Sequence, residues 1–187
     1  MKKILILILA LVTIAITITT LSGCKKEPIT CDKPIDCLPP ATQTAARTFG
    51  CLVDGEVFLP KEKFGRRPLD IAYQFFKGIY HFGIVATNVE ENPRRSVIIG
   101  FTGIELEENK TYQLNTTRED NAPYGEYFIG GGGIIYTTNA DHVGALTITR
   151  FDPDSAIVSG TFWFEAINAA GEEVSITNGR FDSRYIK

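Results

Sequence analysis

The stretch Ile157–Tyr185, IVSGTFWFEAINAAGEEVSITNGRFDSRY, decides the fold class. It holds two long runs rich in branched and aromatic residues, and Ala169-Ala170-Gly171 separates them. In the first run Phe162 and Phe164 face one way and Trp163 faces the other, which is the period of a strand with one buried side. The stretch therefore predicts a long antiparallel hairpin.

The same pattern of short apolar runs separated by turn residues extends back to residue 48. Asp54-Gly55 and Lys77-Gly78 each join two short apolar runs, and such pairs are typical of tight hairpin turns. No segment shows three turns of helical period with caps. The expected strands cover residues 51–53, 57–59, 71–76, 79–85, 96–101, 111–114, 127–129, 134–138, 145–151, 157–167 and 174–185. We therefore expect one all-β domain over 48–187, an antiparallel sandwich or barrel-like meander of about ten strands.

The first 24 residues carry a different signal. Lys2 and Lys3 precede an apolar run, 4–21, which closes on Leu21-Ser22-Gly23-Cys24. This pattern resembles bacterial lipoprotein signals, in which the cysteine thiol is acylated and the chain is cut before it. A retained membrane span is the alternative, but eighteen residues lie at the short edge of the about 17–25 that a span needs. We expect a signal peptide over 1–23 and lipidation of Cys24. Lys25 in place of an aspartate favours the outer membrane, with the leaflet left open.

Residues 24–47 are expected to be a tether, because they hold Pro28, Pro34, Pro39 and Pro40 and show no regular period. Without residues 1–23, which contribute two lysines and no acid, the chain has 17 basic and 22 acidic residues, a charge of −5. This balance argues against nucleic acid as a partner. The basic residues Lys61, Lys63, Arg66 and Arg67 are expected to form a solvated turn.

Three cysteines besides Cys24 allow at most one disulfide within the chain. The possible pairs are Cys31–Cys37, Cys37–Cys51 and Cys31–Cys51, and the sequence does not rank them. Cys51, on an apolar strand, is the cysteine most expected to be buried. Zinc is not expected, because no C-x-x-C motif and no nearby histidine are present.

Three stretches carry a family likeness: residues 38–44, LPPATQT; residues 48–58, TFGCLVDGEVF; and SGTFWF at 159–164 with ITNGRFD at 176–182. Together they resemble a family of uncharacterised single-domain lipoproteins of Bacteroidota. The resemblance implies that phylum, membrane anchoring and an all-β fold, and it implies no substrate, cofactor or catalytic residue. Read without it, Gly160 relieves crowding in a strand and Asn178-Gly179 is a turn or bulge. Asp154-Ser155-Ala156 also resembles the O-glycosylation acceptor pattern of that phylum, which makes Ser155 a candidate site.

Few residues suggest chemistry. His81 alternates within a strand and His142 lies in a polar turn, so neither is expected to be a base or a metal ligand. Gly130–Gly133 is expected to be a hairpin, since a phosphate loop would open a helix, but Gly131 and Gly132 would let a ligand approach the backbone. Trp163 could be an exposed stacking platform, although we favour packing on a sheet covered on both sides. No catalytic set, metal or cofactor is expected.

The sequence thus predicts an outer-membrane lipoprotein whose β domain binds a small ligand or envelope component without catalysis. The alternatives are a structural or assembly partner of another envelope protein and, third, a small hydrolase. An internal cavity would favour a ligand carrier, and a solid core with an exposed apolar patch would favour a protein partner. Carboxylates or histidines with shifted pKa values in a cleft would favour the enzyme.

Overall fold

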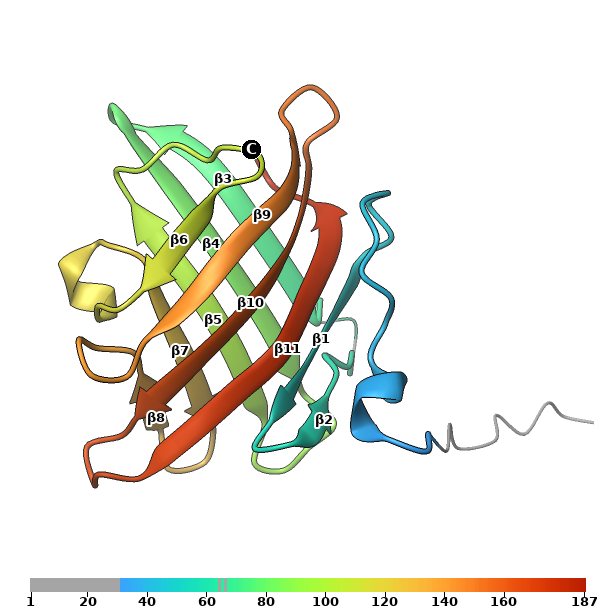
Figure 1. The fold of residues 1–187 in the computed structure, drawn as a ribbon, viewed down its shortest axis with the longest axis vertical. Helices are drawn as coiled ribbons and strands as arrows, with labels where there is room; N and C mark the ends of the chain where they lie inside the picture. Colours follow the sequence, from blue (N-terminus) through green and yellow to red (C-terminus); the bar gives the residue numbers. More distant parts are fainter. Residues whose placement is uncertain (1–30, 64, 66) are drawn as a thin grey trace, which may run out of the picture. The chain divides into compact units, whose positions relative to one another are not determined.

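One antiparallel sheet curls on itself into a half-barrel, which Figure 1 shows from the side. The structure is a computed structural model and describes residues 31–63, 65 and 67–187. Within these residues the strands are β1 (Thr48–Val53), β2 (Glu56–Phe58), β3 (Leu69–Phe76), β4 (Ile79–Asn88), β5 (Arg95–Thr102), β6 (Thr111–Leu114), β7 (Tyr124–Ile129), β8 (Ile134–Thr137), β9 (Gly144–Asp152), β10 (Ile157–Ile167) and β11 (Glu173–Arg184). Two short 3₁₀ helices are η1 (Pro34–Cys37) and η2 (Arg118–Asp120). The predicted all-β antiparallel class is confirmed.

Most strands pair with their neighbour in sequence, as in a meander. The strand order is β2-β1-β11-β10-β8-β7-β5-β4-β3, and β9 also pairs with β10 and carries β6 at its outer edge. Both predicted tight hairpins are present, because Asp54 and Gly55 have φ values of 49° and 83° and Lys77 and Gly78 have 52° and 82°. Positive φ at both central residues is the geometry that matches the twist of paired strands.

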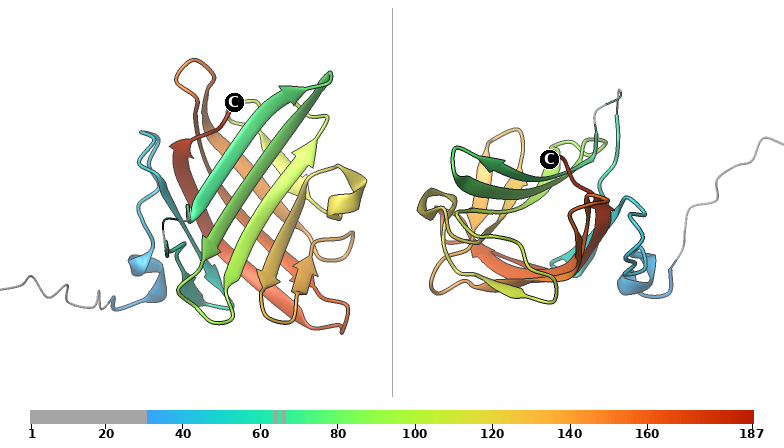
Figure 2. Two further views of the ribbon diagram at one scale, coloured as in Figure 1. Left: turned by 180° about the vertical axis from the view of Figure 1, so that it is seen from behind. Right: turned by 90° about the horizontal axis from the view of Figure 1, so that it is seen from above.

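The curl brings β3 and β11, which are far apart in the sheet order, side by side (Figure 2). A bridge between Ala72 and Ile186 joins this seam. The Ile186 N–H donates to the Ile71 carbonyl at 2.8 Å, and the Ile186 carbonyl accepts from the Tyr73 N–H at 2.9 Å. The Gln74 amide also donates to the Lys187 carbonyl at 3.1 Å, so the hydrogen bonds across the seam lie just after the end of β11.

Side chains fill the inside of the half-barrel. In β10, Phe162, Phe164 and Ala166 point inward and are almost completely buried, as the alternation predicts. Rings from several strands meet there: the centroids of Phe49 and Phe162 lie 5.3 Å apart. Each fully buried ring or branched side chain contributes about 1.5–3 kcal/mol, so this core holds the two halves of the curled sheet together.

Gly160 and Gly179 allow the central strands to approach closely. A Cβ at Gly160 would lie 2.4 Å from the Thr147 carbonyl oxygen, so the predicted relief of crowding is confirmed. A Cβ at Gly179 would lie 2.5 Å from the Phe162 ring. The β10–β11 pairing shifts register beside it, and Asn178 has a φ of 54°, so Asn178-Gly179 forms the predicted bulge.

The second half of the predicted tether needs correction. Residues from Cys31 onward belong to the same compact unit as the sheet, and Leu38 is buried. The chain from Thr42 to Ala46 is held by the carboxylate of Asp182 in β11, which accepts hydrogen bonds from Thr42, Thr44, Ala45 and Ala46. The proline content predicts an extended spacer, but one buried acceptor in a distant strand binds this part of it to the sheet.

Candidate functional site

A groove of about 760 Å³ crosses the outer face of β4, β5, β7 and β8. Two cross-strand rows form its floor. One row runs Val85, Ile98, Glu126 and Thr137, and the other runs Thr87, Ser96, Phe128 and Ile135. The residues that alternate with them along the strands, such as Ile84, Val97 and Ile99, point into the core. The groove is therefore the opposite face of the same alternation that builds the interior.

Apolar side chains dominate part of this floor although it faces outward. Val85 is 41% exposed and Ile135 is 48% exposed, and Ile98 and Phe128 are half-buried beside them. Thr87 and Ser96 share a hydrogen bond of 3.0 Å between their hydroxyls, so their polar groups are already partly satisfied. An antiparallel sheet ordinarily turns polar residues to this side, so an apolar strip there makes this face a candidate binding surface.

Charged groups stand on two sides of the groove. On one side Arg118, from η2, forms a bidentate salt bridge with the buried carboxylate of Glu126. The Arg118 Nε lies 3.2 Å from the Glu126 Oε1, and the Arg118 Nη2 donates to the Glu126 Oε2. This hydrogen bonding raises the pKa of Arg118 above its ordinary value. On the other side the Arg94 guanidinium lies 5.8 Å from the Phe128 ring centroid, a cation–π distance, and no carboxylate pairs with Arg94 in the described part of the chain.

The arrangement suits reversible binding of a molecule with an apolar body and an anionic group. A volume of 760 Å³ falls within the range of small-ligand sites, about 300–1,000 Å³. The apolar rows would cover the body, and Arg94 could donate to the anion. In the described residues no three His, Cys, Asp or Glu side chains are grouped as a metal site requires.

The expectation that Trp163 packs in a covered sheet is wrong. Its side chain is 46% exposed on the outer face of β10, because residues 42–46 cover that face at Ser159 and Asp182 and leave Trp163 uncovered. It lines a separate hollow of about 360 Å³ together with Thr147 and Arg180. Gly131 and Gly132 lie in the predicted hairpin turn between β7 and β8 and contribute to neither the hollow nor the groove. The fold does not bring these predicted ligand contacts together.

The histidines and Ser155 are also placed. His81 is a half-buried residue of β4. The His142 Nδ1 lies 3.2 Å from the Asn139 Oδ1, and its Nε2 lies 3.2 Å from the Glu173 Oε1. Ser155 lies in the β9–β10 turn, where its N–H donates to the Asp152 carboxylate at 2.9 Å. Glycosylation of Ser155 stays a prediction.

Of the three possible disulfides, Cys31–Cys37 is the one that forms, with Cα atoms 5.6 Å apart. Among the described cysteines Cys51 is the free one, and it is buried, as expected. Burial raises the pKa of its thiol to about 12, so at neutral pH it is a protonated core residue. Cys24 and the predicted signal peptide lie outside the described residues. In the described part of the chain, no helix has the length and apolar character that crossing a membrane demands.

The groove was not predicted from the sequence, although its residues lie in strands that were correctly expected. A usable signal was present, because Val85, Ile98, Phe128 and Ile135 are apolar at positions where a half-exposed sheet calls for polar residues. The two arginines could not have been found, because each lies outside the strands and reaches the groove only through the fold.

A family model described as a domain of unknown function (DUF6252) matches residues 78–183, from the β3–β4 turn almost to the end of β11. The match covers all four strands of the groove and agrees with the expectation of an uncharacterised domain. It includes the stretches at 159–164 and 176–182 and excludes those at 38–44 and 48–58. Neither the curated proteins nor the solved structures contain a match to the chain.

Proposed function

Because the chain belongs to the family of DUF6252 domains, whose description names no activity, we propose its role from its own surface: it binds an amphipathic anion in the groove of β4, β5, β7 and β8. The binding is non-catalytic. The observation that carries the proposal is the apolar double row across four strands with Arg94 beside it. Buried side chains fill the interior, which supports a site on the outer face of the sheet and not within the half-barrel.

The ligand class is argued from Arg94; Glu119, the other acid of the groove lining, lies beside Arg118 in η2, on the side away from Arg94. Glu126 is already neutralised by Arg118, so a second cation is not needed there. Arg94 stacks on Phe128 and keeps its donors available for a carboxylate, sulfonate or phosphate. The exposed side chains of Val85 and Ile135 would lose water to an alkyl or aryl body, which contributes about 25 cal/mol for each Å² covered.

The proposed setting is the bacterial envelope, with the domain anchored through lipid on Cys24 to the outer membrane. The lipobox pattern supports this part, and several acyl chains on one cysteine would hold the protein stably. The test is the Cys24→Ala variant, which should leave the membrane fraction and appear in the soluble fraction. Sedimentation of the variant with membranes would remove the lipid anchor from the proposal.

Calorimetric titration with 4-phenylbutanoate and with 4-phenylbutanol tests the groove, because the two probes share an apolar body and differ in charge. We expect the carboxylate to bind more tightly, Arg94→Gln to remove that preference, and Ile98→Asp to abolish binding of both. Arg180→Gln, which removes an arginine from the Trp163 hollow, is the matched control and should change nothing. Equal binding of the two probes by the unmodified protein would contradict the proposed ligand class.

Docking of another envelope protein is a second candidate, favoured by a different observation. The β3–β4 hairpin exposes Phe75 at 64%, Phe76 at 61% and Ile79 at 47%. Three large apolar residues around one turn are uncommon on a free surface. Photo-crosslinking from position 76 in native membranes tests this role: a discrete protein adduct that is lost in Phe75→Ser supports it, and labelling of lipid or water alone contradicts it.

A further inference from the structure

A second pocket lies at the seam between β3 and β11, away from the groove. It measures about 330 Å³ and is lined by residues 67–71 on one side and 183–186 on the other, with Arg47 beside them. The bridge between Ala72 and Ile186 closes one end of the seam. The pocket is the space that opens next to this bridge, where the two strands are no longer hydrogen-bonded to each other.

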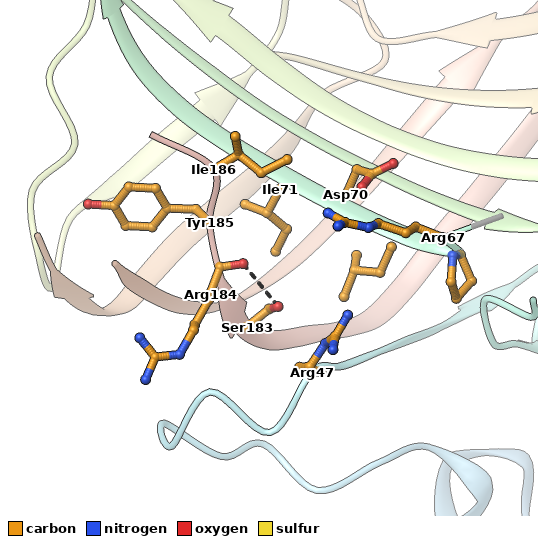
Figure 3. A pocket seen from close by; sticks show the side chains of 10 residues that line it. Arg47, Arg67, Asp70, Ile71, Ser183, Arg184, Tyr185 and Ile186 are labelled. Carbon is orange, nitrogen blue, oxygen red and sulfur yellow. Dashed lines mark hydrogen bonds between the residues drawn. The ribbon is translucent and has the colours of Figure 1, made fainter. Parts of the chain in front are cut away.

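Two arginine side chains converge on the pocket. In Figure 3, Arg47 and Arg67 reach toward the same space from two sides, whereas Arg184 extends away from both. Arg184 donates from its Nη1 to the Ser155 carbonyl, which accounts for its direction. Neither Arg47 nor Arg67 forms an ion pair among the described residues, although Asp70 lines the same pocket. The lining thus carries more positive than negative charge on a chain that is acidic as a whole.

The Arg47 side is held in place by the fold. The three residues before it, Thr44, Ala45 and Ala46, donate their N–H groups to the buried carboxylate of Asp182. Arg47 itself has a φ of 59°, and the next residue, Thr48, pairs with Asp182 in the sheet. The backbone that presents the guanidinium is therefore fixed before any ligand arrives, which lowers the entropy cost of binding.

We infer that this pocket binds a phosphate monoester, with Arg47 and Arg67 donating to its oxygens. Each guanidinium offers a planar fork of donors that matches phosphate oxygens, and two forks suit a dianion better than a single carboxylate. Leu69, Ile71 and Ile186 line the remainder of the pocket and would contact the organic part of the ester. This inference uses none of the groove residues and stands apart from the proposed function.

Asp70 makes the test more specific, because its negative charge repels the negatively charged phosphate. Phenyl phosphate is titrated into the full chain carrying Ile98→Asp, the substitution expected to abolish binding in the groove, so that the titration reports the seam pocket. We expect Arg47→Gln and Arg67→Gln each to weaken binding about tenfold or more, since each removes charge-assisted hydrogen bonds. Arg47→Lys, which keeps the charge but not the fork, should fall between. Asp70→Asn should strengthen binding about threefold, and Arg180→Gln should leave it unchanged.

Two sources of the phosphate are separated by a parallel titration with dihexanoyl phosphatidic acid, a soluble lipid with a phosphomonoester headgroup. Binding of either probe with the variant pattern above supports the inference, and the tighter probe identifies a lipid or a free ester as the source. No measurable binding of either probe overturns it. Unchanged affinity in both arginine variants, or weaker binding in Asp70→Asn with an unchanged melting temperature, also overturns it.

Discussion

Replacing Asp182 by asparagine should destabilise the protein and release its N-terminal segment. The carboxylate is completely buried, and its Oδ2 accepts from the Thr42 hydroxyl at 2.7 Å, the Thr44 N–H at 2.8 Å and the Ala46 N–H at 3.1 Å. Its Oδ1 accepts from the Ala45 N–H at 2.8 Å and from the Ser159 hydroxyl at 2.7 Å. An amide has one acceptor oxygen, so whichever way it turns, at least one backbone N–H meets an NH₂ group.

The expected cost is the sum of two effects. The lost hydrogen bond to a charged acceptor amounts to about 2 kcal/mol, and weakening the others from charged to neutral adds about 1 kcal/mol or more. A loss of about 3 kcal/mol should lower the melting temperature by about 6–12 °C for a domain of this size. Asp154→Asn, in an exposed turn, is the matched control and should change the melting temperature little.

The loss should also depend on pH. Burial alone raises the pKa of Asp182, but the hydrogen bonds from Thr42, Ala46, Ser159 and Thr44 outweigh it and hold the pKa well below its ordinary value. A carboxyl group whose folded pKa is depressed stabilises the fold above its unfolded pKa, near about 4, and this contribution fades as the pH falls further. The gap between the unmodified protein and Asp182→Asn should therefore be full at pH 7 and shrink below about pH 4.

Urea unfolding at pH 7 and at pH 3, followed by tryptophan fluorescence, measures both effects. Limited proteolysis should cut the variant between Pro40 and Arg47 faster than the unmodified protein, because those residues lose their attachment to β11. A variant within about 1 kcal/mol of the unmodified protein at pH 7 would refute the reasoning, since the hydrogen bonds would then contribute little. A gap that stays constant down to pH 3 would refute the assignment of the pH dependence to this carboxylate.

Three further outcomes are expected. Gly160→Ala should lower the unfolding free energy by about 2–3 kcal/mol, because its Cβ would lie 2.4 Å from a carbonyl oxygen. Gly83→Ala, where the added Cβ would enter open space, should change the unfolding free energy by less than about 1 kcal/mol. Equal effects of the two substitutions would contradict the close approach of β9 and β10. The Cys51 thiol, whose pKa burial raises to about 12, should not react with a thiol reagent at pH 8 until the protein is unfolded, and fast labelling of the folded protein would show that the thiol is accessible. Ser155→Ala should lower the apparent mass of the protein from its native host, and an unchanged mass would remove Ser155 as a glycosylation site.

Local patterns predicted much of the fold. The alternation in residues 157–167 and the turns at Asp54-Gly55 and Lys77-Gly78 act over a few residues, so their outcome could be read without knowing the rest of the chain. The exposure of Trp163 is an example of what local patterns do not predict. The prediction of its strand was correct, but which part of the outer face is covered depends on the whole chain, and residues 42–46 cover Ser159 and Asp182 while Trp163 stays exposed.

The candidate sites were less accessible to sequence reasoning. The groove floor could have been suspected from apolar residues on both faces of β4, β5 and β7. Its charged border could not, because Arg94 and Arg118 are 24 residues apart and meet the same face only after β5 and β7 pair. The seam pocket is further removed, since Arg47 and Arg67 face each other across strands from opposite ends of the sheet order.

The β class, the hairpins and the direction in which each strand turns its apolar side follow from the residues alone, because they depend on period and turn chemistry within about ten residues. The folded chain is needed to show that β1 lies beside β11, that Asp182 binds the chain before β1, and that β3 closes toward the C-terminus. Those contacts join segments more than 100 residues apart. Their partners are selected by shared burial and by complementary donors and acceptors, which no local window of sequence contains.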